Sequence, residues 1–166
     1  AIAAIRRNNG ALFYVPANFA GAWTDSAGTD PVNAVADVIG RMTDRTGGTG
    51  VATQATTANK PTVQTNAQGR YVMRFDGSND SLTTNITTGN EGWICAGVTH
   101  TDALGASART IAYSGYGAGT GGGVILQRNG AGSLLSLGIG NNTATQIVSA
   151  TAASNGTPCV SSGGWN

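Results

Sequence analysis

Residues 70–84 read RYVMRFDGSNDSLTT. Tyr71, Met73 and Phe75 alternate with the residues between them, and this two-residue period predicts a strand with one buried face. Five residues that all favour turns follow, DGSND, and the glycine among them can adopt a positive φ without steric cost. Leu82 then predicts a return to an apolar environment. The stretch therefore predicts a strand, a tight polar turn and a second strand.

Short apolar segments separated by turn residues recur along the rest of the chain. The predicted strands cover residues 11–15, 51–57, 62–65, 71–75, 81–84, 92–99, 109–114, 124–128, 134–139, 146–150 and 159–161. Strands at such intervals are typical of a sandwich or barrel. Residues 30–42 fit either a short helix capped by Asp30 or a strand, and residues 115–123, GYGAGTGGG, predict a loop.

Composition sets limits on the class of protein. The chain has 166 residues, which is enough for one domain with a core, and its 26 glycines suit many turns. Hydrophobic residues make up 40% of the chain and the net charge is +1, and both values argue against a disordered chain. Such a charge gives no basic patch for nucleic acid. No apolar run approaches the roughly 20 residues of a membrane span, so we expect no membrane insertion.

Four motifs follow one another in the first half of the chain. They are GAWTD at residues 21–25, VIGRMTDRTG at 38–47, QAT and KPT within 54–62, and FDGSNDSL at 75–82. In this order they resemble the concanavalin A-like, laminin-G-like jelly-roll domains of bacteriophage structural proteins. The chain departs from that pattern at Lys60, where the family usually has Arg, and at Asn79. The resemblance implies strands throughout and favours a strand over residues 37–43.

The resemblance and the strand pattern together give the expected organisation. We predict an all-β fold, a two-sheet antiparallel jelly-roll sandwich, as a single domain over residues 11–166 that is incomplete at its C-terminus. Residues 1–10 are predicted to be a linker or the end of an upstream helix, because AIAAIRR favours helix and Asn8-Asn9-Gly10 favours a stop.

The resemblance also implies a function. It implies a non-enzymatic virion structural protein in a bacteriophage fibre, tail or capsid surface, whose partners are other virion proteins and copies of itself. The alternative is a carbohydrate-binding module that recognises a host-surface glycan. A weaker alternative is a glycan hydrolase, since some proteins with this fold cleave glycans. Fold alone does not choose among these.

Residues that catalysis would need are few. Glycan hydrolysis needs two carboxylates that face the sugar, and Glu91, the only glutamate, lies in a turn context. His100 is the only histidine, and no nucleophile motif lies near it. The GxGxxG pattern at residues 117–122 leads into a strand rather than a helix, so it predicts a loop and not a nucleotide site. We therefore predict that the protein is not an enzyme.

Three pairs of residues are candidates for binding or redox chemistry. Asp76 and Asp80 could bind Ca²⁺, but we favour the interpretation that they cap the turn, and we expect no cofactor. Tyr113 and Tyr116 flank the glycine-rich loop and are the candidates to stack on a sugar ring. Two cysteines in apolar strand contexts could form a disulfide if the fold brought them together, but we favour two free, buried thiols; they are Cys95 and Cys159.

Overall fold

The structure is a computed structural model, and it divides into two compact units that we describe separately. The N-terminal unit is Ala1–Thr87 and the C-terminal unit is Thr88–Asn166. The structure describes residues 11–86, 92–99, 109–114, 123–129, 134–141, 144–152 and 159–165. The predicted helix at residues 1–7 and most of the glycine-rich loop lie outside these residues.

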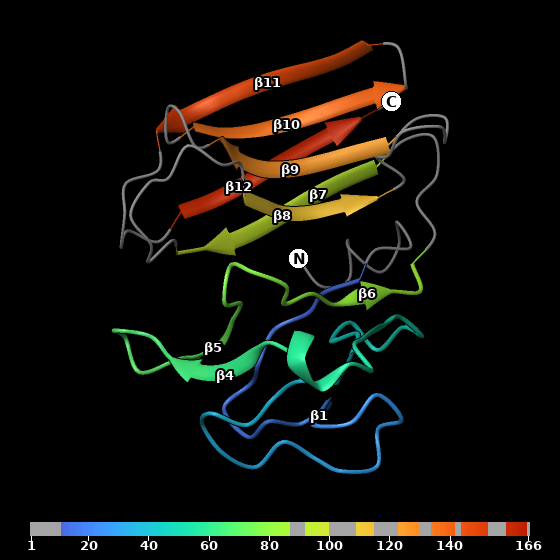
Figure 1. The fold of residues 1–166 in the computed structure, drawn as a ribbon, viewed down its shortest axis with the longest axis vertical. Helices are drawn as coiled ribbons and strands as arrows, with labels where there is room; N and C mark the ends of the chain where they lie inside the picture. The colour runs from blue at the N-terminus through green and yellow to red at the C-terminus, as the bar shows by residue number, and fades with distance from the viewer. Residues whose placement is uncertain are drawn as a thin grey trace. The chain divides into compact units, whose positions relative to one another are not determined.

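The N-terminal unit consists of short antiparallel strands joined by long loops (Figure 1). One sheet has four strands in the order β1-β2-β3-β6, and β4 and β5 form a separate pair. The bounds are β1 Ala22–Trp23, β2 Arg41–Thr43, β3 Val51–Thr53, β4 Thr62–Thr65, β5 Tyr71–Arg74 and β6 Thr83–Thr84, with a 3₁₀ turn, η1, at Thr57–Asn59.

The core of this unit begins with one row of residues across its sheet. Met42 lies opposite Ala22 on one side and Ala52 on the other, and all three are buried. Ile39 and Val63 complete the fully buried centre of the cluster. Because successive strand residues point to opposite faces, the neighbouring residues of β1 and β2 form the other face of the sheet.

The pair β4–β5 confirms most of what residues 70–84 predict. Tyr71 and Met73 pack against the core cluster, as does Leu82 after the turn, and Gly77 has a positive φ of 78°. The expectation for Phe75 is wrong, since its side chain is 46% exposed. The strand ends at Arg74, so the two-residue alternation no longer applies one residue later.

Several segments of the N-terminal unit differ from prediction, and of the strand predicted over 81–84 only Thr83–Thr84 forms. Residues 11–15 form no strand. Leu12 contacts the loop after β2 instead: its N–H donates to Asp44 Oδ1, and its C=O accepts the N–H of Arg45. Residues 30–42 form no helix, and the strand predicted over 37–43 is limited to β2 and one bridge from Val38 to Thr62. The strand predicted over 51–57 ends at Thr53.

The C-terminal unit has longer strands, all antiparallel (Figure 1). Its four-stranded sheet has the order β11-β10-β9-β8, while β12 pairs with β7 and approaches β9 and β10. The bounds are β7 Gly92–Val98, β8 Arg109–Ser114, β9 Gly123–Asn129, β10 Leu134–Asn141, β11 Ala144–Ala152 and β12 Cys159–Trp165. Every strand predicted for this part of the chain is confirmed, most with slightly different ends.

Strand register gives the four-stranded sheet two different faces. One row across the sheet is Ala112, Leu126, Leu137 and Val148, all apolar, and the rows beside it on the same face mix apolar residues with Arg128, Gln146 and Ser114. The opposite face carries glycines and hydroxyl residues, including Ser136, Gly140, Thr145 and Ser149, on either side of a row made of Tyr113, Ile125, Gly138 and Ile147.

Antiparallel strands account for almost all regular structure in the described residues, and the only helical segment there is η1. The prediction of an all-β protein is therefore confirmed. Within the same residues no helix is long and apolar enough to cross a membrane. The jelly-roll sandwich and the single domain over residues 11–166 stay predictions.

Candidate functional site

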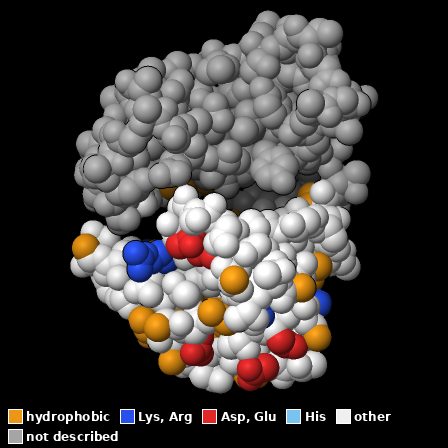
Figure 2. Space-filling view, in the orientation of Figure 1, with side chains coloured by type: hydrophobic (Ala, Val, Ile, Leu, Met, Phe, Trp, Pro, Cys, Tyr) orange, Lys and Arg blue, Asp and Glu red, His pale blue; other side chains and the backbone are white. Residues whose placement is uncertain are grey.

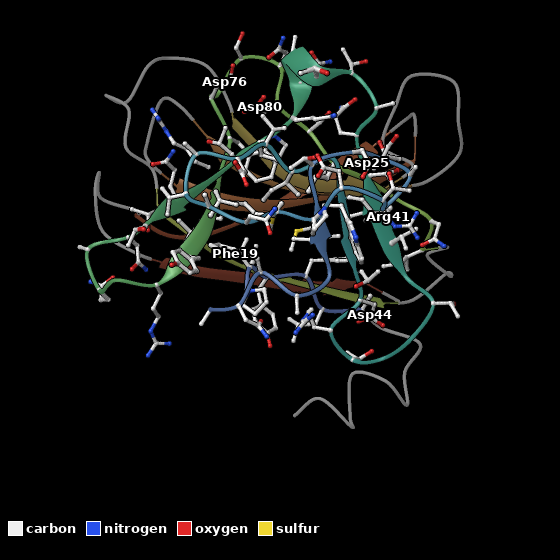
Figure 3. All side chains as sticks on the ribbon, turned by 90° about the horizontal axis from the view of Figure 1, so that it is seen from below. Phe19, Asp25, Arg41, Asp44, Asp76 and Asp80 are labelled. Atoms are coloured by element: carbon white, nitrogen blue, oxygen red, sulfur yellow. The ribbon has the colours of Figure 1, made fainter. Side chains whose placement is uncertain are left out.

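The turn between β5 and β6 is capped by its own carboxylates (Figure 3). Asp76 Oδ1 accepts hydrogen bonds from the N–H groups of Ser78 at 2.8 Å, Asn79 at 3.2 Å and Asp80 at 3.3 Å. Asp80 Oδ2 accepts the N–H of Asp76 at 2.9 Å. The N–H of Ser78, with the other donors, lowers the pKa of Asp76 below its ordinary value. Both aspartates therefore act as turn caps.

These hydrogen bonds use the carboxylate oxygens that a calcium ion would need as ligands. Ca²⁺ binds about six to eight oxygen ligands that converge on one point. Here the oxygens of Asp76 and Asp80 are directed at backbone N–H groups, and the residues that the structure describes hold no group of three or more His, Cys, Asp or Glu side chains that could bind a metal. Calcium binding at this turn stays a hypothesis, and measuring ligand binding with and without a chelator tests it.

A second carboxylate holds the loop after β1. Asp25 Oδ1 accepts the N–H groups of Gly28 at 3.2 Å, Thr29 at 2.9 Å and Asp30 at 3.0 Å, and its Oδ2 accepts the Thr29 hydroxyl at 2.7 Å. These bonds, led by the N–H of Asp30, lower the pKa of Asp25 strongly. The carboxylate thus closes residues 25–30 into a compact loop.

A third carboxylate, Asp44, is buried, with 7% of its surface exposed. It accepts four hydrogen bonds, from the N–H of Leu12 at 3.0 Å, the N–H and hydroxyl of Thr46 at 2.8 and 2.6 Å, and the N–H of Gly48 at 3.1 Å. Burial acts to raise the pKa of Asp44, but these bonds outweigh burial and lower it. Asp44 joins the start of the unit to the loop after β2.

Two cationic side chains, Lys60 and Arg41, donate hydrogen bonds to backbone carbonyls of the loop at residues 24–27. Lys60 Nζ donates to the carbonyl of Thr24 at 2.9 Å, and Arg41 Nη1 donates to the carbonyl of Ala27 at 3.4 Å. The Arg41 guanidinium also lies over the ring of Trp23, 5.8 Å from its centroid, a cation–π contact. These cations are therefore engaged with the chain itself.

The charged groups do not gather into one catalytic cluster in the described part of the N-terminal unit. Figure 3 shows the loops of Asp25, Asp44 and Asp76 at separate places. On the face shown in Figure 2, carboxylates and cations are distributed among uncharged side chains. Sequence reasoning assigned no role to Asp25, Asp44 or Arg41, although an Asp followed by Thr and Gly within a few residues is a signal for a capped turn.

The tyrosine candidates lie in the C-terminal unit. Tyr113 belongs to β8 and pairs with Ile125, which in turn pairs with Gly138, so its register position is on the face rich in glycine and hydroxyl residues. Tyr116 lies outside the described residues, as do Glu91 and His100. The structure therefore places one of the two tyrosines on a sheet face.

The two cysteines lie in one strand pair but not opposite each other. Cys95 pairs with Ser162, whereas Cys159 pairs with Val98. They are three register positions apart, about 10 Å along the strands. A disulfide needs Cα atoms within about 7 Å, so this register supports free thiols.

Comparison with known proteins identifies no family for this chain. No protein-family model, no curated protein and no solved structure matches this chain. The function is therefore argued from the residues and the geometry above.

Proposed function

We propose that this chain is a non-enzymatic structural protein of a bacteriophage virion, in the fibre, the tail or the capsid surface. We further propose that it folds as a two-sheet antiparallel jelly-roll sandwich of the concanavalin A-like type. The motif order over residues 21–84 supports both, because it resembles that of jelly-roll domains in such proteins. The confirmed antiparallel strands are consistent with the fold.

The observation that carries the proposal is the use of the carboxylates. Every aspartate in residues 11–86 accepts a hydrogen bond from the chain's own backbone or hydroxyl groups. Catalytic carboxylates instead face a substrate and have pKa values tuned to proton transfer. The pKa values of Asp25, Asp44 and Asp76 are lowered by hydrogen bonds from the chain itself, which occupy oxygens that a substrate would otherwise contact. This favours a scaffold over an enzyme.

The motifs that carry the resemblance also have structural roles. Asp25 of GAWTD closes one loop, Asp44 of VIGRMTDRTG anchors another, and Asp76 of FDGSNDSL caps the third. Lys60 of KPT donates to the carbonyl of Thr24, which lies within GAWTD. Motifs with such roles support a shared fold and are not evidence of a shared reaction.

The test is the location of the intact protein. Purified particles of the virus that encodes the chain would be examined by quantitative mass spectrometry and by immunogold electron microscopy. We expect the protein in the particles at a constant copy number, with label at one type of site. Protein that is free and monomeric in infected cells and absent from purified virions would contradict the proposal.

A second candidate function is recognition of a host-surface glycan. The register position of Tyr113 favours it. Tyr113 pairs with Ile125 on the face that also carries glycines and hydroxyl residues, and an aromatic ring can stack on a sugar ring while hydroxyls on the same face supply donors and acceptors. Binding of the purified chain to host cells and isolated surface glycans would be measured with Ca²⁺ and with a chelator.

The outcomes of that binding experiment are distinct. Saturable binding that Tyr113→Ala abolishes, and that Tyr14→Ala in the other unit leaves intact, would establish a glycan site at β8. Loss of binding on chelation, and in the Asp76→Asn variant, would identify the turn as a calcium site. No binding by the folded chain would leave the structural function standing alone.

A further inference from the structure

Strand β11 forms one edge of the four-stranded sheet. It is the longest of the described strands, with nine residues, and among those strands it pairs only with β10. In an antiparallel ladder alternate residues direct their N–H and C=O groups away from the neighbour. The outer side of β11 therefore presents a row of hydrogen-bonding groups that can pair with another strand.

The two edges of this sheet differ in how they are protected. The opposite edge, β8, is shorter, begins with Arg109 and contains a register shift between Thr110 and Ala112. Short length, charge and bulges are the usual features that prevent one edge from pairing with another. Strand β11 contains no charged residue, no proline and no glycine, and no charged residue follows Arg128 in the chain.

The sequence of β11 suits pairing with a copy of itself. The one register shift between β10 and β11 involves Leu134 and Leu135, so residues 144–150, ATQIVSA, run without irregularity. An antiparallel pair centred on Ile147 places small residues opposite small ones and hydroxyls opposite hydroxyls. The resulting pairs are Ala144 with Ala150, Thr145 with Ser149, and Gln146 with Val148.

We propose that β11 pairs with β11 of a second copy of this chain across a two-fold axis at Ile147, joining two four-stranded sheets into one continuous sheet. The interface is isologous, so each copy contributes the same strand. This proposal names a partner in the assembly proposed above and so rests on that function. It also explains why the edge with the weakest protection is the longest strand.

The test uses charge placed on the glycine- and hydroxyl-rich face. In the proposed register Thr145 of one copy lies opposite Ser149 of the other, and both positions lie on that face rather than on the apolar one. The double variant T145K/S149K places like charges opposite each other twice, whereas T145K/S149E places opposite charges there. T110K puts the same lysine on the other edge and is the matched control.

Analytical ultracentrifugation over a wide range of concentration gives the readout. We expect a dimer for the wild-type chain, for T110K and for T145K/S149E. We expect T145K/S149K to raise the dimer dissociation constant on the order of a hundredfold, because like charges across an interface cost several kcal/mol. Circular dichroism checks that each variant is folded. If T145K/S149K is unfolded, the oligomeric state of T145K/S149E tests the pairing of β11 with β11.

Two results would overturn the pairing. One is a wild-type chain that is monomeric at every concentration. The other is a dimer that T145K/S149K leaves intact or that T145K/S149E fails to form. A monomer that is nevertheless found in purified virions overturns only the pairing, and a dimer absent from virions overturns only the virion function, so the two failures are distinguishable.

Discussion

The two units of this chain use different interactions to hold their backbones. In the N-terminal unit each described strand has only two to four residues, and the loops between them are closed by Asp25, Asp44 and Asp76. In the C-terminal unit the strands have six to nine residues and pair along their length. Backbone groups must find partners in either case. The first unit supplies many of them from side chains, and the second supplies them from strand ladders.

This difference teaches where each unit is vulnerable. A loop closed by a carboxylate depends on the charge and position of one side chain. In a strand ladder the backbone N–H and C=O groups bond to one another, so the ladder tolerates changes of side chain. Substitutions in the two units test this contrast, and a change in the packed core should cost the most stability.

The largest effect is expected in the core of the N-terminal unit. Met42 is fully buried in the row across β1, β2 and β3, so Met42→Ala removes packed atoms and leaves a cavity. We expect the free energy of unfolding to fall by about 2–5 kcal/mol, measured by chemical denaturation. Val35→Ala is the control, because Val35 is 44% exposed and its loss should cost less than about 0.5 kcal/mol.

The next largest effect concerns the buried carboxylate. Asp44→Asn keeps the size of the side chain but turns an amide N–H toward the N–H of Gly48 or the Thr46 hydroxyl. We expect a loss of about 1–3 kcal/mol in the free energy of unfolding. Asp30→Asn is the control, since its carboxylate is exposed and its partner, the Thr24 hydroxyl, can rotate.

Hydrogen exchange shows whether that loss is confined to one unit. We expect Asp44→Asn to speed amide exchange around Leu12 and Thr46 while the amides of β9 and β10 keep their protection. An equal increase in both units would contradict the comparison between them.

Acid should weaken the same contacts. The pKa of Asp44 is lower in the folded chain than its ordinary value of 3.8, so its contribution to stability is present above that value. The contribution is lost as the pH falls through the folded pKa. We expect the difference in melting temperature between wild type and Asp44→Asn to be constant near neutral pH and to shrink below about pH 4. A difference that grows in acid would show that the sign is wrong.

A smaller effect is expected in the turn of residues 76–80. Gly77 has a φ of 78°, and a Cβ added there would meet no atom within 4 Å, so the cost of Gly77→Ala is conformational. We expect a loss of about 1–2 kcal/mol in the free energy of unfolding. Gly77→Asn should cost less, because Asn adopts positive φ more readily. Equal losses for both variants would mean that the side chain meets an obstacle.

The smallest effect is expected from reducing agents. Because Cys95 and Cys159 are three register positions apart in β7 and β12, we expect two free thiols after unfolding without reductant. The melting temperature should not change with reductant. A disulfide between them, found by mass spectrometry without reduction, would show that β7 and β12 pair in another register.

The sequence by itself determined the all-β class and the strands of the C-terminal unit, because strand periodicity and turn chemistry are local. The alternation in residues 71–74 and the positive φ of Gly77 follow from neighbouring residues, and the strands of the C-terminal unit are long enough for the same pattern to find them all. Even the charge-free edge of β11 can be read from its residues, although not its place at the edge.

Only the tertiary structure decided how the loops are held. The N–H of Leu12 bonds to a carboxylate 32 residues away and its C=O to the N–H of Arg45, and residues 11–15 form no strand. Phe75 is exposed because β5 ends one residue before it, and Cys95 lies opposite Ser162 because of a pairing between distant strands. Local sequence sets the period of a strand and the φ of a turn. It does not determine which distant group will accept a hydrogen bond, because that depends on how the whole chain folds.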